Sequence, residues 1–420
     1  MVLGGEELRK LGVKFFEAGF LDLEGNLRLR VFPAELFDRV ASEGYGFDGY
    51  STGFVGIEES DLVAVPRAST LYVYSVGGVK RAFAICDIYK DDKPLEADPR
   101  RMLSSFVESL PYEVKVGLEP EFYLVRDGRP VDDRFYMFHT SDHDMYSLLA
   151  GLLGELRRTG VDAFLIHHEV GPGQFEITLP HGDPVQACDT YVFFKKFVKE
   201  YAEAHGLTAT FMPKPFAGKP GSGLHMHVSA VRGGRWVFGE GELSEEGRRF
   251  LGGLLKYSRG ICLYTNPTVN SYKRLVPGFE APVYPVWGRG NRSVLVRVPA
   301  YRSNSPVRFE YRAPDSSGNV YLAVLAVLWA GDRGLREGAD PGEEFRANAY
   351  KKTPEVAPLP SSLEEALRVA RREPLGRTFD RFVTLKRREW DEYVRHCHAK
   401  GVDPHTTRIT EWELEHYFHR

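Results

Sequence analysis

The stretch EVKVGLEPEFYLV, residues 113–125, alternates apolar and polar side chains along its length. Apolar residues from Val114 to Leu124 share one parity, whereas Glu119 and Glu121 share the other. Successive side chains of a β-strand point to opposite faces of a sheet, so this pattern predicts a strand with one apolar and one polar face. Both carboxylates are expected to project from the polar face.

Three later runs repeat this alternation. Their polar faces carry these residues: His225, His227 and Ser229 in residues 223–229, Arg297 in residues 294–298, and Arg308, Glu310 and Arg312 in residues 307–312. Any one run by itself suits the solvated face of a half-exposed sheet. A solvated face would favour lysine and scattered charge, however, and Lys115 is the only lysine in the four runs. Carboxylates and imidazoles bind Mg²⁺ or Mn²⁺ and arginines grip phosphate, so the set predicts a metal-phosphate cavity lined by strands.

Residues 167–176, HHEVGPGQFE, lie between these runs. Glu169 and Glu176 have opposite parity, but the Gly-Pro-Gly interruption allows both to turn toward one site. His167 and His168 are expected to be structural, because nothing local makes either one a ligand. No second histidine follows at the spacing of a zinc-protease motif, which excludes that class.

The remaining pattern divides the chain into a domain over residues 1–97 and a domain over residues 98–420. Residues 21–31 predict a hairpin around a Glu-Gly-Asn turn. Asp98 followed by proline predicts a helix cap at the start of the second domain. That domain is expected to be α+β, with helical segments over these ranges: 183–205, 361–372 and 378–420.

Composition excludes several classes of protein. The 420 residues carry a formal charge of only -3 without a long basic run, so a small ligand is expected rather than nucleic acid. The most apolar helical stretch, residues 321–330, is too short to cross a bilayer, and the start of the sequence lacks a signal pattern. We therefore expect a cytoplasmic protein without a membrane partner. Four cysteines without a CxxC pair are expected to be buried, inert thiols.

One stretch carries a resemblance to a known family. Residues 266–282, NPTVNSYKRLVPGFEAP, are close to the signature of type I glutamine synthetase over their whole length. Other blocks resemble that family in the expected order: residues 47–49, 60–62, 211–215, 221–227 and 412–414. The resemblance implies an N-terminal β-grasp domain and a C-terminal catalytic domain with a curved antiparallel sheet flanked by helices. It further implies a homo-oligomer, a dodecamer of two hexameric rings, with sites at subunit interfaces.

The resemblance also implies an activity and its ligands. The family phosphorylates the γ-carboxylate of L-glutamate with ATP as co-substrate and transfers the acyl group to ammonia, using two or three Mg²⁺ or Mn²⁺ ions per site. Carried over to this sequence, one metal would be held by Glu121, Glu169 and Glu176, and the second by Glu119, His225 and Glu310. ATP would contact His227, Ser229, Arg292 and Arg308, and the substrate would contact Ser51, Gly221, Arg274 and Arg297.

Four residues would act on the reacting groups: Asp48, Glu280, Arg292 and Arg312. Asp48 would reach in from a neighbouring subunit to bind and deprotonate the amine. Glu280, on a mobile flap that follows Arg274, would close the site, and the two arginines would stabilise the phosphoryl group.

The sequence departs from the family at the nitrogen site. Tyr50 and Pro220 stand where ammonia-using relatives usually have serine and asparagine, and residues 135–136 read Phe-Tyr where a Tyr-Phe pair is usual. An alternative function is therefore a γ-glutamyl ligase that uses an organic amine or polyamine. A third hypothesis is a non-catalytic assembly protein, but a scaffold would have no physical reason to keep costly clustered charges.

Overall fold

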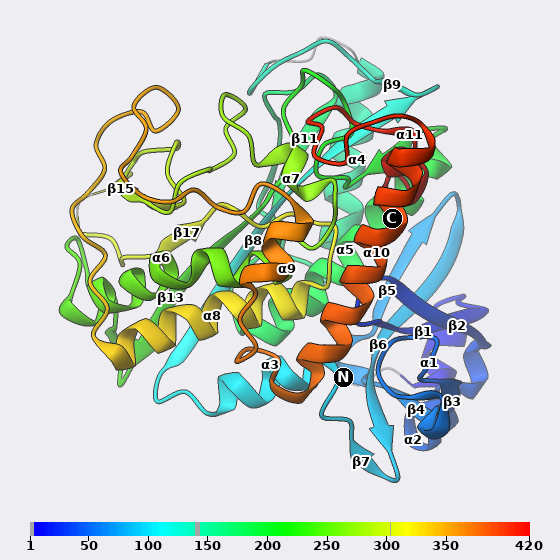
Figure 1. Ribbon diagram of the computed structural model, residues 1–420. Coiled ribbons are helices and arrows are strands. Elements are labelled where there is room, and N and C mark those ends of the chain that lie inside the picture. The colour runs from blue at the N-terminus through cyan, green and yellow to red at the C-terminus, as the bar shows by residue number, and fades with distance from the viewer. Residues whose placement is uncertain (1–3, 139–142, 303) are drawn as a thin grey trace.

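A computed structural model describes residues 4–138, 143–302 and 304–420, which form two sheets and their covering helices (Figure 1). The helices are α1 Gly5–Lys10, α2 Phe37–Glu43, α3 Pro99–Glu108, α4 His143–Arg158, α5 Pro184–Ala204, α6 Glu245–Thr265, α7 Ser271–Arg274, α8 Val320–Glu337, α9 Leu363–Val369, α10 Phe379–Ala399 and α11 Glu411–Tyr417. The strands of the first sheet are β1 Phe15–Leu21, β2 Leu27–Pro33, β3 Tyr45–Asp48, β4 Asp61–Pro66, β5 Tyr72–Val76, β6 Val79–Lys90 and β7 Lys93–Pro94. Those of the second are β8 Glu113–Arg126, β9 Arg129–Pro130, β10 Leu165–His168, β11 Gln174–Thr178, β12 Thr208–Thr210, β13 Leu224–Arg232, β14 Arg235–Trp236, β15 Trp287–Arg289, β16 Val296–Val298 and β17 Phe309–Tyr311.

The first sheet has the order β2-β1-β6-β4-β3, with β5 and β7 also paired to β6. β1 and β2 form the predicted hairpin. The Asp22 carboxylate closes its turn by accepting hydrogen bonds from the N–H groups of Glu24 and Asn26, at 3.0 and 2.8 Å. The pairing of β1 with β6 is parallel, so the sheet is mixed.

The second sheet has the order β10-β11-β8-β13-β17-β16-β15. Its named strands pair antiparallel as predicted, with one exception: β15 and β16 are parallel. Their register sets Trp287 opposite Val296, so residues 290–295 must bring the chain back to the start of β15. Gly290, with φ of +62°, begins this return in a conformation that glycine adopts without strain.

Helices cover the apolar face of the second sheet. Phe122 of β8 packs against Phe194 of α5, with ring centroids 6.2 Å apart. α6 and α8 approach closely at Gly253 and Gly334, where an added Cβ would lie 2.6 Å or less from the backbone of the other helix. Because helices fill the apolar face, the polar face remains available for a site.

Long helices also join the two domains (Figure 1). Tyr72 of the first sheet stacks on Phe193 of α5 at 4.0 Å, and Lys386 of α10 forms an ion pair with Glu24 at 3.2 Å. The helix predicted over residues 361–372 is shorter than expected, because Ser362 caps its start and Ala370 takes an extended ψ of 138°. The predicted helical tail consists of two helices, α10 and α11. All four cysteines are buried and unpaired, as expected.

The predicted cap of α3 is confirmed and has an unusual electrostatic property. The Asp98 side chain accepts a hydrogen bond from the Arg100 N–H at 3.1 Å, while its second oxygen is buried without a partner among the described residues. Burial raises the pKa of Asp98 to about 7. A carboxyl group whose pKa is raised on folding binds its proton more tightly in the folded state than in the unfolded state. Its contribution to stability is complete below the unfolded-state pKa and is lost as the pH rises through the folded-state pKa.

Replacing Asp98 with asparagine should therefore stabilise the protein more at pH 8 than at pH 5. Asparagine caps a helix as well as aspartate but carries no charge to bury. The full gain is at most about 4 kcal/mol, from roughly three pKa units. Thermal unfolding of both variants at the two pH values measures it. Asp183 caps α5 from an exposed position, and Asp183→Asn is the matched control. A gain independent of pH would contradict the prediction.

Candidate active site

The polar face of the second sheet bounds a cavity of about 550 Å³. Strand register aligns its ionisable residues in pairs: Glu176 with Glu121, His225 with Glu119, and Glu310 with His227. Residues paired across neighbouring strands project from the same face of a sheet. The alternation predicted along each strand thus becomes one continuous row of side chains across β11, β8, β13 and β17.

The burial of these side chains excludes the interpretation that the row is a solvated outer face of the sheet. Glu121 and Glu176 are each 8% exposed, His225 is 6% exposed and Glu310 is 1% exposed. Charged groups leave water only when partners compensate for the lost hydration. A row of buried carboxylates and imidazole therefore indicates a site built for cations or charged ligands.

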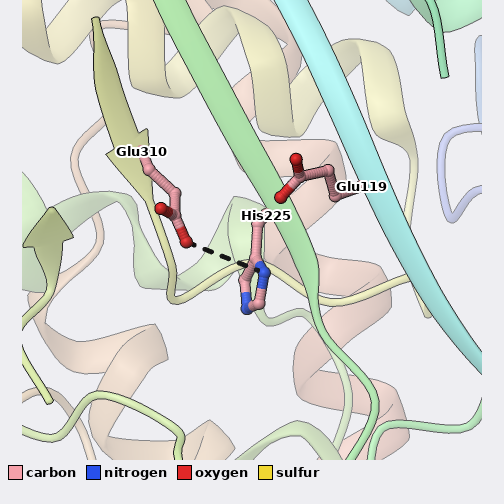
Figure 2. A group of neighbouring side chains, drawn as sticks. All are labelled: Glu119, His225 and Glu310. Carbon is pink, nitrogen blue, oxygen red and sulfur yellow. Dashed lines mark ion pairs between the residues drawn. The ribbon is translucent and has the colours of Figure 1, made fainter. Parts of the chain in front are cut away.

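Three groups of side chains within the described residues have the spacing of metal ligands, with donor atoms lying within 4.8 Å of one another. The groups are Glu119 with His225 and Glu310, Glu121 with Glu176 and His225, and Glu169 with His167 and Glu176. Figure 2 shows the first group, in which three neighbouring strands supply one side chain each and Glu310 lies 3.9 Å from the His225 ring. The second metal set expected from the sequence thus comes together as one group.

The other expected set, Glu121 with Glu169 and Glu176, is divided between two groups that share Glu176. His167, which was expected to be structural, lies beside the row of candidate metal ligands. Its ring lines the cavity, and Nε2 lies 2.9 Å from a Glu169 oxygen. The pairing of β10 with β11 sets His167 opposite Glu176, and this register is not visible in the local sequence. Its shared parity with Glu169 was the available signal.

His168 points away from this row, as expected of a structural residue. Its Nε2 lies 3.0 Å from the Asp132 carboxylate, and its ring packs against Phe175 with centroids 4.9 Å apart. Neighbouring histidines on one strand thus serve opposite faces of the sheet.

The carboxylates repel one another in the absence of a cation. Burial, followed by the charge of Glu169, raises the pKa of Glu121 to about 7. Burial and the neighbouring Glu119 also raise the pKa of Glu176 well above its usual value. A divalent cation would reverse this balance, since its charge favours the ionised form of every nearby carboxylate. The donor set therefore fits hard cations that prefer oxygen ligands.

Glu310 has the opposite environment. Its two oxygens accept hydrogen bonds from the guanidinium groups of Arg297 and Arg312, the second at 2.5 Å. Burial alone would raise the pKa of Glu310, but Arg312, then His227, His225 and Arg297, lower it well below the usual range. Glu310 is thus a permanently charged group that joins the carboxylate row to the arginines.

The predicted phosphate-binding arginines all line the cavity: Arg292, Arg297, Arg308 and Arg312. Arg308 Nε donates to His227 Nδ1 at 3.3 Å, and Arg292 is exposed near Tyr301. The cavity therefore combines carboxylates with adjacent guanidinium groups, as an arrangement of metal ions and phosphates requires.

Arg274 and Gly221 also line the cavity and contact each other. Arg274 is 2% exposed, and its guanidinium donates to the carbonyl of Ala313 at 2.6 Å and to that of Arg312 at 3.1 Å. A Cβ at Gly221 would lie 2.4 Å from the Pro213 oxygen and 2.7 Å from Arg274 Cγ. Glycine is required there because the backbone packs directly on the arginine.

Three predicted residues lie elsewhere. Ser229 lines an adjoining hollow of about 370 Å³, which shares His227 and Arg308 with the main cavity. Asp48 and Ser51 lie on the first domain, and within one chain the structure does not bring them to the cavity. The Asp48 carboxylate is exposed and accepts a hydrogen bond from Ser51 Oγ at 2.5 Å. Glu280 lines the cavity, in agreement with its predicted position.

The residues singled out as departures are also divided. Pro220 and Tyr136 line the cavity, and the Tyr136 ring contacts His167 edge-on with centroids 5.5 Å apart. Tyr50 and Phe135 are exposed outside it, at 54% and 60%.

Comparison with known proteins identifies the family. Residues 12–91 match the β-grasp domain of glutamine synthetase, and residues 96–417 match the glutamine synthetase catalytic domain. The chain belongs to the glutamine synthetase family. It is 40% identical over 432 residues to the glutamine synthetase of Thermococcus kodakarensis, covering 97% of this chain and 96% of that relative. The glutamine synthetase of Pyrococcus horikoshii is 41% identical over 438 residues, covering 99% and 98%.

Solved structures agree with this assignment. GmaS in complex with ADP is 31% identical to this chain, with a TM-score of 0.86 and 99% coverage of both chains, and GmaS without ligand gives the same values. The predicted fold, a β-grasp domain followed by a glutamine synthetase catalytic domain, is confirmed, as is the ligase class. The family in general uses ATP and divalent metals. No helix in the three described ranges has the length and apolar character needed to span a membrane.

Proposed function

We propose that this protein ligates L-glutamate to ammonia with ATP, forming glutamine, ADP and phosphate. The observation that carries the proposal is the buried row of carboxylates and histidines, with four arginines lining the same cavity. A carboxylate is a poor acylating agent until its oxygen becomes a leaving group. Phosphoryl transfer to the γ-carboxylate therefore has to precede attack by nitrogen, and the site must stabilise charge at that stage.

The residues of the cavity would have different roles in this reaction. The six predicted metal ligands would hold the divalent ions, which neutralise charge on the phosphates when bound. Arg292, Arg297, Arg308 and Arg312 would hold the transferred phosphoryl group and the nucleotide phosphates. Arg274 would bind the substrate carboxylate, and Gly221 would present its backbone beside it. His227 and Ser229 would contact ATP at the junction with the adjoining hollow, which we assign to the nucleoside.

The metal count and the assembly are part of the same proposal. Three donor groups, of which two share His225 and two share Glu176, suit two or three Mg²⁺ or Mn²⁺ ions. Asp48 is exposed on the first domain and lies outside its own chain's cavity, which supports a role in the site of a neighbouring subunit. We propose a dodecamer of two hexameric rings, cytoplasmic, whose subunits divide into residues 1–97 and 98–420.

The nitrogen donor is tested by product formation from a panel of amines. We expect glutamine from ammonium and at least about 10²-fold lower kcat/KM with methylamine, ethylamine or a diamine, because a site that excludes water leaves no room for added carbon atoms. Phosphate release and product mass are measured with ATP, glutamate and Mg²⁺ or Mn²⁺. A higher kcat/KM for an organic amine would replace ammonia by that amine in the proposal.

Chelation of the metal should stop all turnover, and activity with EDTA present would contradict the assigned ligands.

A further inference from the structure

Lys214 contacts two loops that contribute residues to the cavity lining. Its backbone is fixed from both sides, since its N–H donates to Asn270 Oδ1 at 2.7 Å and its carbonyl accepts from Asn270 Nδ2 at 3.2 Å. Asn270 also donates to Glu413 of α11 at 2.9 Å. The Lys214 residue is 5% exposed, so the orientation of its side chain is restricted by packing.

The ammonium group of Lys214 has unusual partners for a buried lysine. It lies 3.7 Å from the centroid of the Phe279 ring and donates to the Lys219 carbonyl. Across the described part of the chain it forms no ion pair with a carboxylate. Burial, followed by the positive charge of Arg274, lowers the pKa of Lys214 to about 8. The charge is therefore held by an aromatic face and a carbonyl rather than by a counter-ion.

Each partner belongs to a loop that ends in the cavity. The Lys219 carbonyl lies two residues before Gly221, and Phe279 directly precedes Glu280; Gly221 and Glu280 both line the cavity. We call residues 276–280 the flap segment. It is largely exposed, with Phe279 half-buried.

The flap segment needs such a contact because its last residue is strained. Glu280 has a φ of +60°, a left-handed conformation that residues other than glycine adopt only when surrounding contacts hold them. Arg312 Nη2 donates a hydrogen bond to the Glu280 carbonyl at 3.3 Å. The Lys214 contact with Phe279 is thus a second anchor, on the residue next to the strained one.

We propose that Lys214 is a positioning residue that latches the flap segment against the glycine loop and so keeps Glu280 over the reacting groups. This deepens the proposed function and rests on it for its catalytic consequence. With the latch intact, the flap shields the activated glutamate from water until the nitrogen nucleophile arrives. Without it, water competes for the acyl group, and phosphate is released without amide formation.

The test uses four variants of the full-length protein. Lys214→Met keeps the apolar stem and removes the charge, whereas Lys214→Arg retains a cation that can stack on Phe279. Phe279→Leu removes the aromatic ring of the half-buried Phe279 and leaves Lys214 in place. Lys219→Met is the matched control, because that side chain is exposed and forms no hydrogen bond or ion pair with the described residues.

The first measurement is amide hydrogen exchange of peptides covering residues 275–283 in the protein without substrates. Lys214→Met and Phe279→Leu should exchange about 5- to 30-fold faster than wild type, the range expected for losing a desolvated cation–π contact. Lys214→Arg should restore most of the protection, and Lys219→Met should match wild type. Unchanged exchange in the first two variants would overturn the latch. Because no substrate is present, this result is independent of the proposed ligase activity.

The second measurement is the ratio of phosphate released to glutamine formed. We expect a ratio near one for wild type and Lys219→Met, and an increase of about fivefold or more for Lys214→Met with a smaller change in the KM for ATP. A ratio of one in all variants would show that the latch does not guard the intermediate. If wild type forms no glutamine at all, the proposed function fails while the exchange result still decides the latch.

Discussion

Glu310→Ala should reduce turnover by about 10³-fold or more, because it removes a proposed ligand of a divalent cation whose charge stabilisation is worth several kcal/mol. It should also destabilise the folded protein. Arg297 and Arg312 are 5% and 2% exposed, and both donate to the Glu310 carboxylate. Removing one partner of a buried ion pair leaves uncompensated charge and costs about 3–5 kcal/mol. Steady-state kinetics and denaturant unfolding measure the two effects.

Two variants separate these effects. Glu310→Gln keeps the size of the side chain and an acceptor for the arginines but loses the charge that a cation needs, so activity should fall more than stability. Glu43→Ala is the matched control, since that exposed carboxylate pairs with Arg39 at 2.9 Å on the surface. We expect little change from it, because solvent screens exposed pairs. Equal losses in Glu310→Ala and Glu43→Ala, or full activity in Glu310→Ala, would refute the assigned role.

Asp48→Ala should reduce glutamine formation by about 10² to 10⁴-fold, the usual contribution of a positioned acid or base. The hydrogen bond from Ser51 lowers the pKa of Asp48, which keeps the carboxylate ionised and able to attract an ammonium ion. Asp48 belongs to β3, where it pairs with the exposed Asp61. Asp61→Ala is therefore a matched control and should retain activity.

Mixed oligomers test whether Asp48 acts in a neighbouring subunit. If Asp48 completes the cavity of another protomer, co-assembly of Asp48→Ala subunits with Arg292→Ala subunits pairs two intact halves at about one quarter of the sites. Activity should return to roughly that fraction of wild type, although each variant alone is inactive. Arg292 is chosen because it is exposed and its loss leaves the buried arginines paired. No recovery in verified mixed oligomers would exclude the shared site.

Much of the polar face of the second sheet could be predicted without coordinates. Alternation along β8 put Glu119 and Glu121 on one side, and alternation along β13 did the same for His225 and His227. These predictions held because side-chain direction in a strand is a local property with a period of two residues. The cap of α3 and the β1–β2 hairpin were predictable for the same reason, since a cap or a tight turn involves residues close together in the chain.

Other features depend on which distant segments pair, and local patterns contain no such information. His167 joins the site because β10 pairs with β11, and Glu176 joins two donor groups because β11 also pairs with β8. The contact between Lys214 and Phe279 spans two loops. Strand alternation was enough to predict which residue types face the polar side, and the resemblance was enough to identify the family. The partners of these residues emerge only in the folded chain, because strand register and loop packing follow from the free energy of the whole fold rather than of any short segment.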